Sequence, residues 1–117
     1  MSPNRTTPRD IPPVHPGEIL KDEFLDEYGL SQYELAKRIG VPAPRVNAIV
    51  LGKRRISADS ALRLGRFFGT SPEFWLNLQN HYDLTLAKDA AGEEIERGIP
   101  LGAGQANLRA DDAKGAH

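Results

Sequence analysis

The sequence of 117 residues contains no cysteine, one tryptophan and only three histidines, which stand far apart. Without cysteine there is no disulfide, thiolate zinc site or thiol nucleophile. His15, His81 and His117 do not have the spacing of metal ligands, so we expect neither a metal nor another cofactor. The serines occupy cap-like or surface positions and no motif places a base beside them, so we expect no enzyme.

The chain also lacks a hydrophobic run of the roughly 20 residues that a membrane-spanning helix requires. Residues 1–16 are polar and rich in proline, unlike the basic stretch and apolar core of a secretory signal. We therefore expect a cytoplasmic protein without membrane contact. A chain of this length forms one small domain that leaves little room for a deep substrate cleft.

Charge is distributed unevenly, although the formal net charge is only −1. Residues 17–30 carry five acidic and one basic side chain, residues 31–66 carry two acidic and eight basic, and residues 71–98 carry six acidic and two basic. A basic segment of this kind can attract phosphate despite an acidic total. The alternative is that the lysines and arginines only solvate helix faces.

Apolar periodicity and capping signals predict an all-α fold of five helices, with no strand signal. The predicted helices cover residues 16–28, 31–39, 42–51, 57–68 and 73–82, the last extending or restarting to residue 91, where Gly92 ends it. Residues 1–14 are predicted to be a flexible arm and residues 92–117 a disordered tail, which leaves residues 15–91 as the folded domain.

Two buried faces follow from helical spacing. Leu20, Phe24 and Tyr28 recur every four residues and are predicted to form the inward stripe of the first helix. The fourth helix is predicted to turn four residues inward, namely Ala61, Leu62, Leu64 and Phe68.

A helix-turn-helix is indicated where the second and third predicted helices are joined by only two or three residues. Ala36 is small enough for close backbone approach, Gly40 accepts the left-handed conformation of the turn, and Val46 packs the third helix onto the second. An ordinary αα-hairpin could carry the same residues, but the basic segment coincides with this motif. We therefore predict that residues 15–91 are a helix-turn-helix DNA-binding domain, and we expect them to hold the dimer contacts as well.

If the third helix enters the major groove, its exposed N-terminal positions face base edges. The predicted base-reading residues are Ala43, Pro44, Arg45, Asn47 and Ala48. Arg45 can pair with guanine and Asn47 with adenine, although Arg45 could equally contact a phosphate. The predicted phosphate-binding residues are Gln32, Lys53, Arg54 and Arg55.

The last helix carries more apolar residues than one face of a small bundle needs, namely Phe74, Trp75, Leu78 and Tyr82. Part of this stripe is core, and Trp75 and Leu78 are candidates for a dimer interface. A dimer is expected on separate grounds, because one helix-turn-helix reads few bases whereas a two-fold pair reads both halves of an inverted repeat.

Three segments resemble the HigA (VapI-type) antitoxins of type II toxin–antitoxin modules, within the XRE/Cro-like helix-turn-helix family. They are residues 15–20 (HPGEIL), 30–56 (LSQ through GKRRI) and 61–79 (ALRL through FGTSPEFWLNLQ). The resemblance implies a lambda-repressor-like bundle that acts as a homodimer, represses its own operon and neutralises a HigB-like, mRNA-cleaving toxin. The chain departs from the usual pattern at residues 42–44, where Pro-Ala-Pro replaces hydroxyl and polar residues.

Two alternative functions remain open from the sequence. One is a stand-alone XRE-family repressor without a toxin partner. The other is a protein-interaction module whose basic surface binds an acidic protein rather than DNA.

Overall fold

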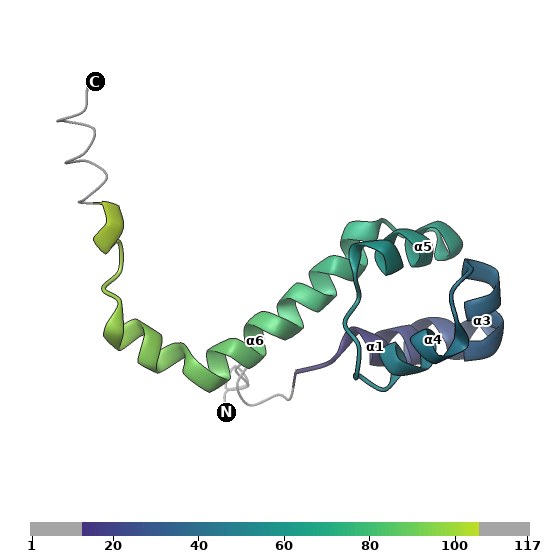
Figure 1. Ribbon diagram of the computed structural model, residues 1–117, viewed down its shortest axis with the longest axis horizontal. Coiled ribbons are helices and arrows are strands. Elements are labelled where there is room, and N and C mark those ends of the chain that lie inside the picture. Colours follow the sequence, from purple (N-terminus) through teal and green to yellow (C-terminus); the bar gives the residue numbers. More distant parts are fainter. Residues whose placement is uncertain (1–12, 106–117) are drawn as a thin grey trace, which may run out of the picture. The chain divides into compact units, whose positions relative to one another are not determined.

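The computed structural model describes residues 13–105, and over that range it contains helices and no strand (Figure 1). The elements are α1 (Pro16–Ile19), the π-helix η2 (Leu20–Leu25), α2 (Asp26–Tyr28), α3 (Gln32–Ile39), α4 (Ala43–Val50), α5 (Ala58–Phe68) and α6 (Pro72–Gly98). The all-α prediction is confirmed, and its five helices are present, the first as the three successive segments α1, η2 and α2. Two compact units meet inside α6, after Leu86.

Serine caps fix the starts of three helices at the predicted positions. The hydroxyl oxygens of Ser31, Ser57 and Ser71 each accept a backbone N–H three residues on, at 3.0, 3.1 and 3.1 Å. Each bond satisfies one of the N–H groups that a helix leaves without an internal partner. Gly40 and Gly69 end α3 and α5 in the left-handed conformation that glycine adopts at low cost.

The first helix differs from its predicted pattern because its middle is a π-helix. The N–H of Asp26 donates to the carbonyl of Lys21, five residues earlier. Residues five apart therefore share a face, and Leu20 and Leu25 are both buried. The predicted stripe is correct for Leu20 but wrong for Tyr28, which is 60% exposed.

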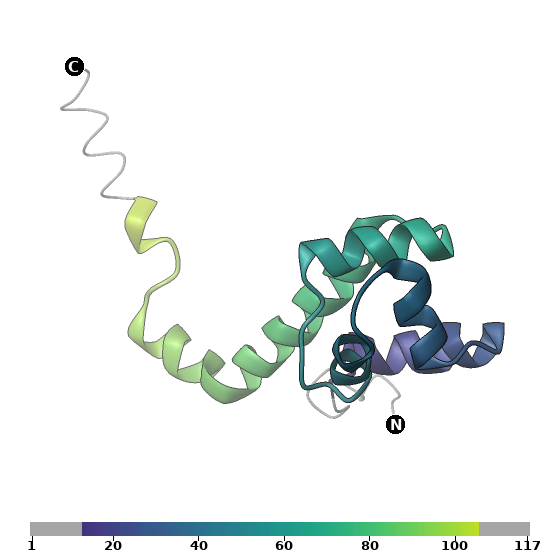
Figure 2. The ribbon, with the colours of Figure 1, turned by 45° about the vertical axis from the view of Figure 1, so that its right-hand side comes forward.

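The core of the first unit collects residues from η2, α3, α4, α5 and the beginning of α6. Figure 2 shows how the helices of this unit are arranged. Leu35, Val46, Leu64 and Trp75 are fully or almost fully buried in this core. The inward prediction for Leu62 is wrong, because this side chain is 60% exposed on α5. Trp75 buries its whole surface within its own chain, which corrects the suggestion that its side chain faces a second subunit.

The predicted end of the last helix at Gly92 is also wrong, since α6 continues to Gly98. Glycine inside a helix costs only about 1 kcal/mol, so it does not by itself end one. Residues 92–98, predicted to be disordered, are helical. The predicted arm up to residue 12 and the predicted tail beyond residue 105 lie outside the described residues.

Gly17 permits the close contact between α1 and α4. A Cβ at this position would collide with the backbone carbonyl of Ile49, which cannot move without shifting α4. The absence of a side chain therefore sets the distance at which α1 crosses α4.

We expect Gly17→Ala to destabilise the fold by about 3 kcal/mol, the upper range for overpacking, because a backbone must move. Gly29→Ala is the matched control, since a Cβ there meets nothing within 4 Å and only the left-handed backbone at φ 62° is strained, at about 1–2 kcal/mol. Urea unfolding of both variants measures the difference. Equal losses would contradict a steric role for Gly17.

Candidate nucleic-acid interface

Helices α3 and α4 form the predicted helix-turn-helix. Gly40 adopts φ 75° at the turn, and Val41 donates its N–H to the carbonyl of Ala36 at 3.0 Å. Ala36 and Val46 are both buried, so the small residue and the branched residue lie in the contact between the two helices. Ala36, Gly40 and Val46 thus occupy the places that the motif predicts for them.

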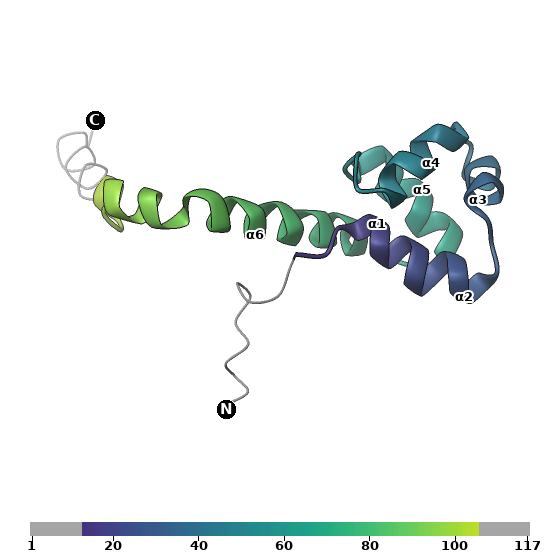
Figure 3. The same cartoon turned by 90° about the horizontal axis from the view of Figure 1, so that it is seen from below.

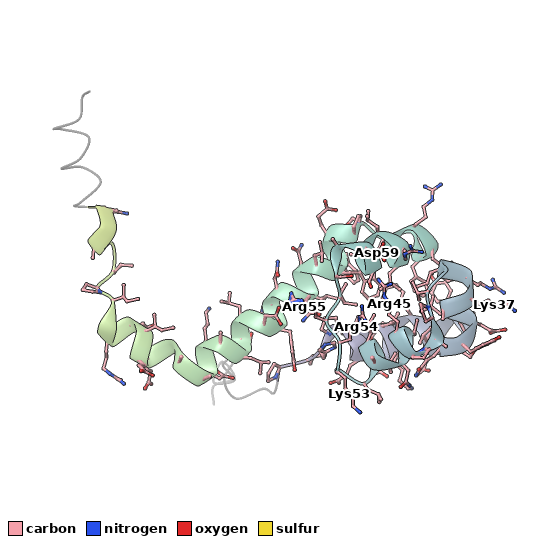
Figure 4. The ribbon with its side chains drawn as sticks, viewed as in Figure 1. Lys37, Arg45, Lys53, Arg54, Arg55 and Asp59 are labelled. Carbon is pink, nitrogen blue, oxygen red and sulfur yellow. The ribbon has the colours of Figure 1, made fainter. Side chains whose placement is uncertain are left out.

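Arg45 does not extend freely from α4. Its Nη2 atom donates to Asp59 Oδ2 at 2.7 Å and to Ser60 Oγ at 3.0 Å, and its side chain is only 19% exposed. Figure 4 shows Arg45 beside Asp59, between α4 and α5. The Arg45 guanidinium therefore connects α4, the helix predicted to enter the major groove and called the recognition helix below, to α5.

Asp59 is shared between two arginines. Arg63 donates its Nε–H to the same carboxylate at 2.9 Å, and its Nη1 donates to the carbonyl of Ile39 at 2.7 Å. Hydrogen bonds from Arg45 and then from Arg63 lower the pKa of the Asp59 carboxyl below its ordinary value of 3.8. One carboxylate therefore joins the recognition helix, α5 and, through Arg63, the last carbonyls of α3.

Gln32 and Asn47 form the polar pair on the outer surface of the motif. Asn47 Nδ2 donates to Gln32 Oε1 at 3.0 Å, which joins the first residue of α3 to the exposed side of α4. Asn47 is exposed and Gln32 is half-buried. This bond uses one polar atom of each amide. The Asn47 oxygen and the Gln32 amide nitrogen therefore remain available to bind another molecule.

The other predicted base-reading residues offer apolar contacts. Pro44 is exposed, and Ala43 and Ala48 are half-buried at the beginning and middle of α4. None of the three side chains can form a hydrogen bond, although each can contact a thymine methyl group.

The basic loop after α4 comprises Lys53, Arg54 and Arg55, which are all exposed. The backbone N–H groups of Lys53 and Arg54 donate to the carbonyl of Ala48 at 2.8 and 3.2 Å, which fixes the loop against the end of α4. Lys53 and Arg54 form no ion pair among residues 13–105, whereas Arg55 pairs with Asp83 at 2.9 Å. In Figure 4 the side chain of Lys53 points away from the bundle.

A buried glutamine connects this loop to α6. Gln79 accepts the N–H of Ile56 at 2.7 Å and donates to Asp83 at 3.0 Å. The role of Gln79 is not predictable from the sequence, where it lies among the apolar residues of the last helix. The pairing of Asp59 with Arg63 has a sequence signal, since opposite charges four residues apart meet on a helix.

His15 supports the loop from the other side. Its Nδ1 accepts the N–H of Gly17 at 2.9 Å and caps α1, and its ring packs edge-on against Tyr82 with centroids 4.9 Å apart. Burial lowers the pKa of His15 below its ordinary value of 6.5, while Asp83 and Glu18 act in the opposite direction. His15 is therefore held in the neutral form, which the cap requires.

Residues 13–105 contain no group of three or more histidine and acidic side chains that could hold a metal ion. None of the helices in that part of the chain is both long and apolar enough to cross a membrane.

Two short helices around a left-handed glycine, with basic and amide side chains on the outer surface, define a helix-turn-helix DNA-binding protein. A family model described as "Helix-turn-helix" matches residues 21–75. "Virulence-associated protein I" of Dichelobacter nodosus is 44% identical over 85% of this chain and 91% of its own length. "Antitoxin HigA-1" of Vibrio cholerae is 37% identical over 76% and 84% of the two chains.

Among solved structures, Pseudomonas aeruginosa antitoxin HigA with the higBA promoter is 56% identical, with a TM-score of 0.73 over 76% of this chain and 98% of that one. The chain belongs to the HigA/VapI family of helix-turn-helix antitoxins. The lambda-repressor-like fold that the resemblance implies is confirmed, and membership of this family also confirms the expectation, drawn from the serine positions, that the chain is not an enzyme.

We expect the stability of the protein to fall as the pH drops through 6.5 towards the lowered pKa of His15, because the unfolded chain then binds a proton that the folded chain refuses. Above about pH 7 this contribution is fully present. His15→Asn keeps a capping side chain without a titrating group, so its unfolding free energy should change less between about pH 7.5 and about pH 5.

The control for this experiment is His81→Asn, which alters an exposed histidine on α6. Urea unfolding at several pH values should show the wild-type pH dependence for His81→Asn. Retention of that dependence in His15→Asn would refute the assignment to His15.

Proposed function

We propose that this protein is the operator-binding antitoxin of a type II toxin–antitoxin module, that it represses its own operon, and that it neutralises a HigB-like, mRNA-cleaving toxin in the cytoplasm. Two observations carry the DNA-binding part: the Gln32–Asn47 pair on the outer surface of the motif, and the exposed Lys53 and Arg54, which form no ion pair within residues 13–105. The Pseudomonas aeruginosa relative was solved with the higBA promoter, which supports DNA of the same class as the ligand.

In this proposal Asn47 is the main polar base-reading residue, with Gln32 holding it in place and contacting a phosphate. Ala43, Pro44 and Ala48 add apolar contacts and shape selection. Lys53 and Arg54 neutralise phosphates, and Arg55 joins them when it leaves Asp83. Arg45 acts as a positioning residue, because its guanidinium is already bound by Asp59 and Ser60.

The protein acts as a homodimer on an inverted repeat, because two copies present two recognition helices to half-sites about 34 Å apart. Leu78 is half-buried on α6 and remains a candidate for the dimer contact. Leu84 and Leu86 lie on the same helix with more than two-fifths of their surface exposed, which makes them further candidates.

We expect Asn47→Ala to weaken operator binding by about 1–3 kcal/mol and to leave random DNA nearly unaffected. Arg45→Ala and Asp59→Asn should weaken operator binding by amounts similar to each other, since both substitutions release α4 from α5. Loss in Asp59→Asn is diagnostic, because removing a negative charge would by itself strengthen DNA binding. Fluorescence anisotropy with operator and random duplexes measures all three.

The comparison variant for electrostatics is Lys53→Ala. It should weaken binding to every DNA sequence and reduce the slope of log affinity against log salt concentration by about one. If Arg45→Ala affects only one operator position while Asp59→Asn binds as the wild type does, Arg45 reads a base and the positioning role is wrong.

Co-expression with the product of the adjacent gene tests the antitoxin function. We expect that product alone to halt growth, and this protein to restore growth and co-purify with it. Absence of toxicity and of a complex, with operator binding intact, would favour a stand-alone repressor. Absence of salt-dependent DNA binding at low ionic strength would favour a protein-interaction module.

A further inference from the structure

Six of the eight phenylalanine, tyrosine and tryptophan residues of the chain lie in one cluster. All four phenylalanines, the only tryptophan and Tyr28 are linked by ring contacts, including Phe24 with Phe68 at 4.8 Å and with Trp75 at 4.9 Å between centroids. The cluster begins at Trp75, which is fully buried, and ends at Tyr28 and Phe74, which are 60% and 36% exposed. The hydrophobic core therefore reaches the surface at this point.

We call this surface the aromatic edge and define it by the exposed rings of Tyr28 and Phe74 and the half-buried rings of Phe24 and Phe68. Tyr28 packs against Phe68 at 5.2 Å and Phe24 packs against Phe74 at 6.1 Å, so the four rings form one continuous surface. A single exposed aromatic is ordinary, but contiguous rings on a rigid support are typical of the centre of a protein interface.

The charged side chains next to the aromatic edge in the sequence are negative. Glu23 and Glu27 lie next to Phe24 and Tyr28 in the chain, and Glu73 precedes Phe74; all three are exposed. Within residues 13–105 none of the three forms an ion pair, whereas on the same run Lys21 pairs with Asp26 at 3.2 Å. Carboxylates without cationic partners thus flank the exposed rings.

The exposed rings and the flanking carboxylates together determine which kind of molecule can bind the aromatic edge. DNA is repelled by the carboxylates. A second copy related by two-fold symmetry would place the patch against itself, with carboxylates facing carboxylates. An arginine-rich protein surface fits, because a guanidinium can both stack on a tyrosine ring and pair with a carboxylate.

We infer that the aromatic edge is the docking surface for a basic protein. Given the proposed function, on which this inference rests, that protein is the toxin. Figure 3 shows α2, which carries Tyr28, at the edge of the bundle away from α4. The geometry therefore leaves the recognition helix free while the basic partner is bound.

Two single substitutions test the docking surface. Tyr28→Ser removes an exposed ring and Glu27→Lys reverses an exposed charge, so neither disturbs the core. We expect each to weaken the affinity for the adjacent-gene toxin by about tenfold, measured by titration calorimetry with full-length protein. Tyr28→Ser, which changes no charge, should leave operator affinity unchanged. Higher salt should weaken the wild-type complex and affect Glu27→Lys less.

Leu62→Ser and Glu94→Lys are the matched controls. Leu62 is as exposed as Tyr28, but it lines a separate pocket of about 490 Å³, formed by residues of α3 and α5, whose lining includes Arg38 and Arg66. Both controls should bind the toxin as the wild type does. If Leu62→Ser loses binding while Tyr28→Ser does not, the partner uses that pocket and the aromatic edge is the wrong surface.

The remaining outcomes separate the inference from the proposed function. Equal toxin binding by the wild type, Tyr28→Ser and Glu27→Lys would overturn the docking surface and leave the antitoxin function intact. A toxin that does not bind the wild type would overturn both. Sedimentation that shows a wild-type dimer dissociated by Tyr28→Ser would assign the aromatic edge to self-association instead.

Discussion

The carboxylate of Asp59 is the constraint on which the DNA-binding surface depends. It accepts from Arg45 on the recognition helix and from Arg63 on its own helix, and Arg63 in turn binds the carbonyl of Ile39 at the end of α3. The three helices that must keep a fixed relative orientation thus meet at one charged group. Packing of Val46 sets how closely α4 lies against α3, and Asp59 adds the directional bonds that packing lacks.

This network changes the role expected for Arg45, a basic residue in the first turn of the recognition helix α4. Arginine on an exposed position suggests base contact from sequence alone, because guanidinium pairs well with guanine. Once the same group is bound by a carboxylate and a hydroxyl, moving it to a base would leave Asp59 with one cation fewer. We therefore propose that polar base recognition rests on Asn47, held by its partner Gln32, rather than on Arg45.

Most of the fold was predictable because its signals are local. Ser31, Ser57 and Ser71 cap helices where the sequence places them, and Gly40 makes the predicted turn. Contacts between distant residues were not predictable in the same way. The π-helix turned Tyr28 outward, and Gln79 and Asp59 act on partners supplied by other elements. The motif predicts which positions face the DNA bases, whereas the availability of each side chain there depends on tertiary contacts.

The near-zero net charge is the sum of one basic and one acidic surface. It does not mean that the electrostatic field around the protein is weak everywhere. Basic residues gather around α4 and the loop after it, while the acidic residues of η2 and α2 lie on another part of the bundle. At physiological ionic strength charges more than about 8 Å apart are largely screened, so the acidic region weakens phosphate binding little. A basic protein bound there would neutralise that region and reduce its repulsion of DNA further. Charge separation on one small bundle thus makes two partners of opposite charge compatible.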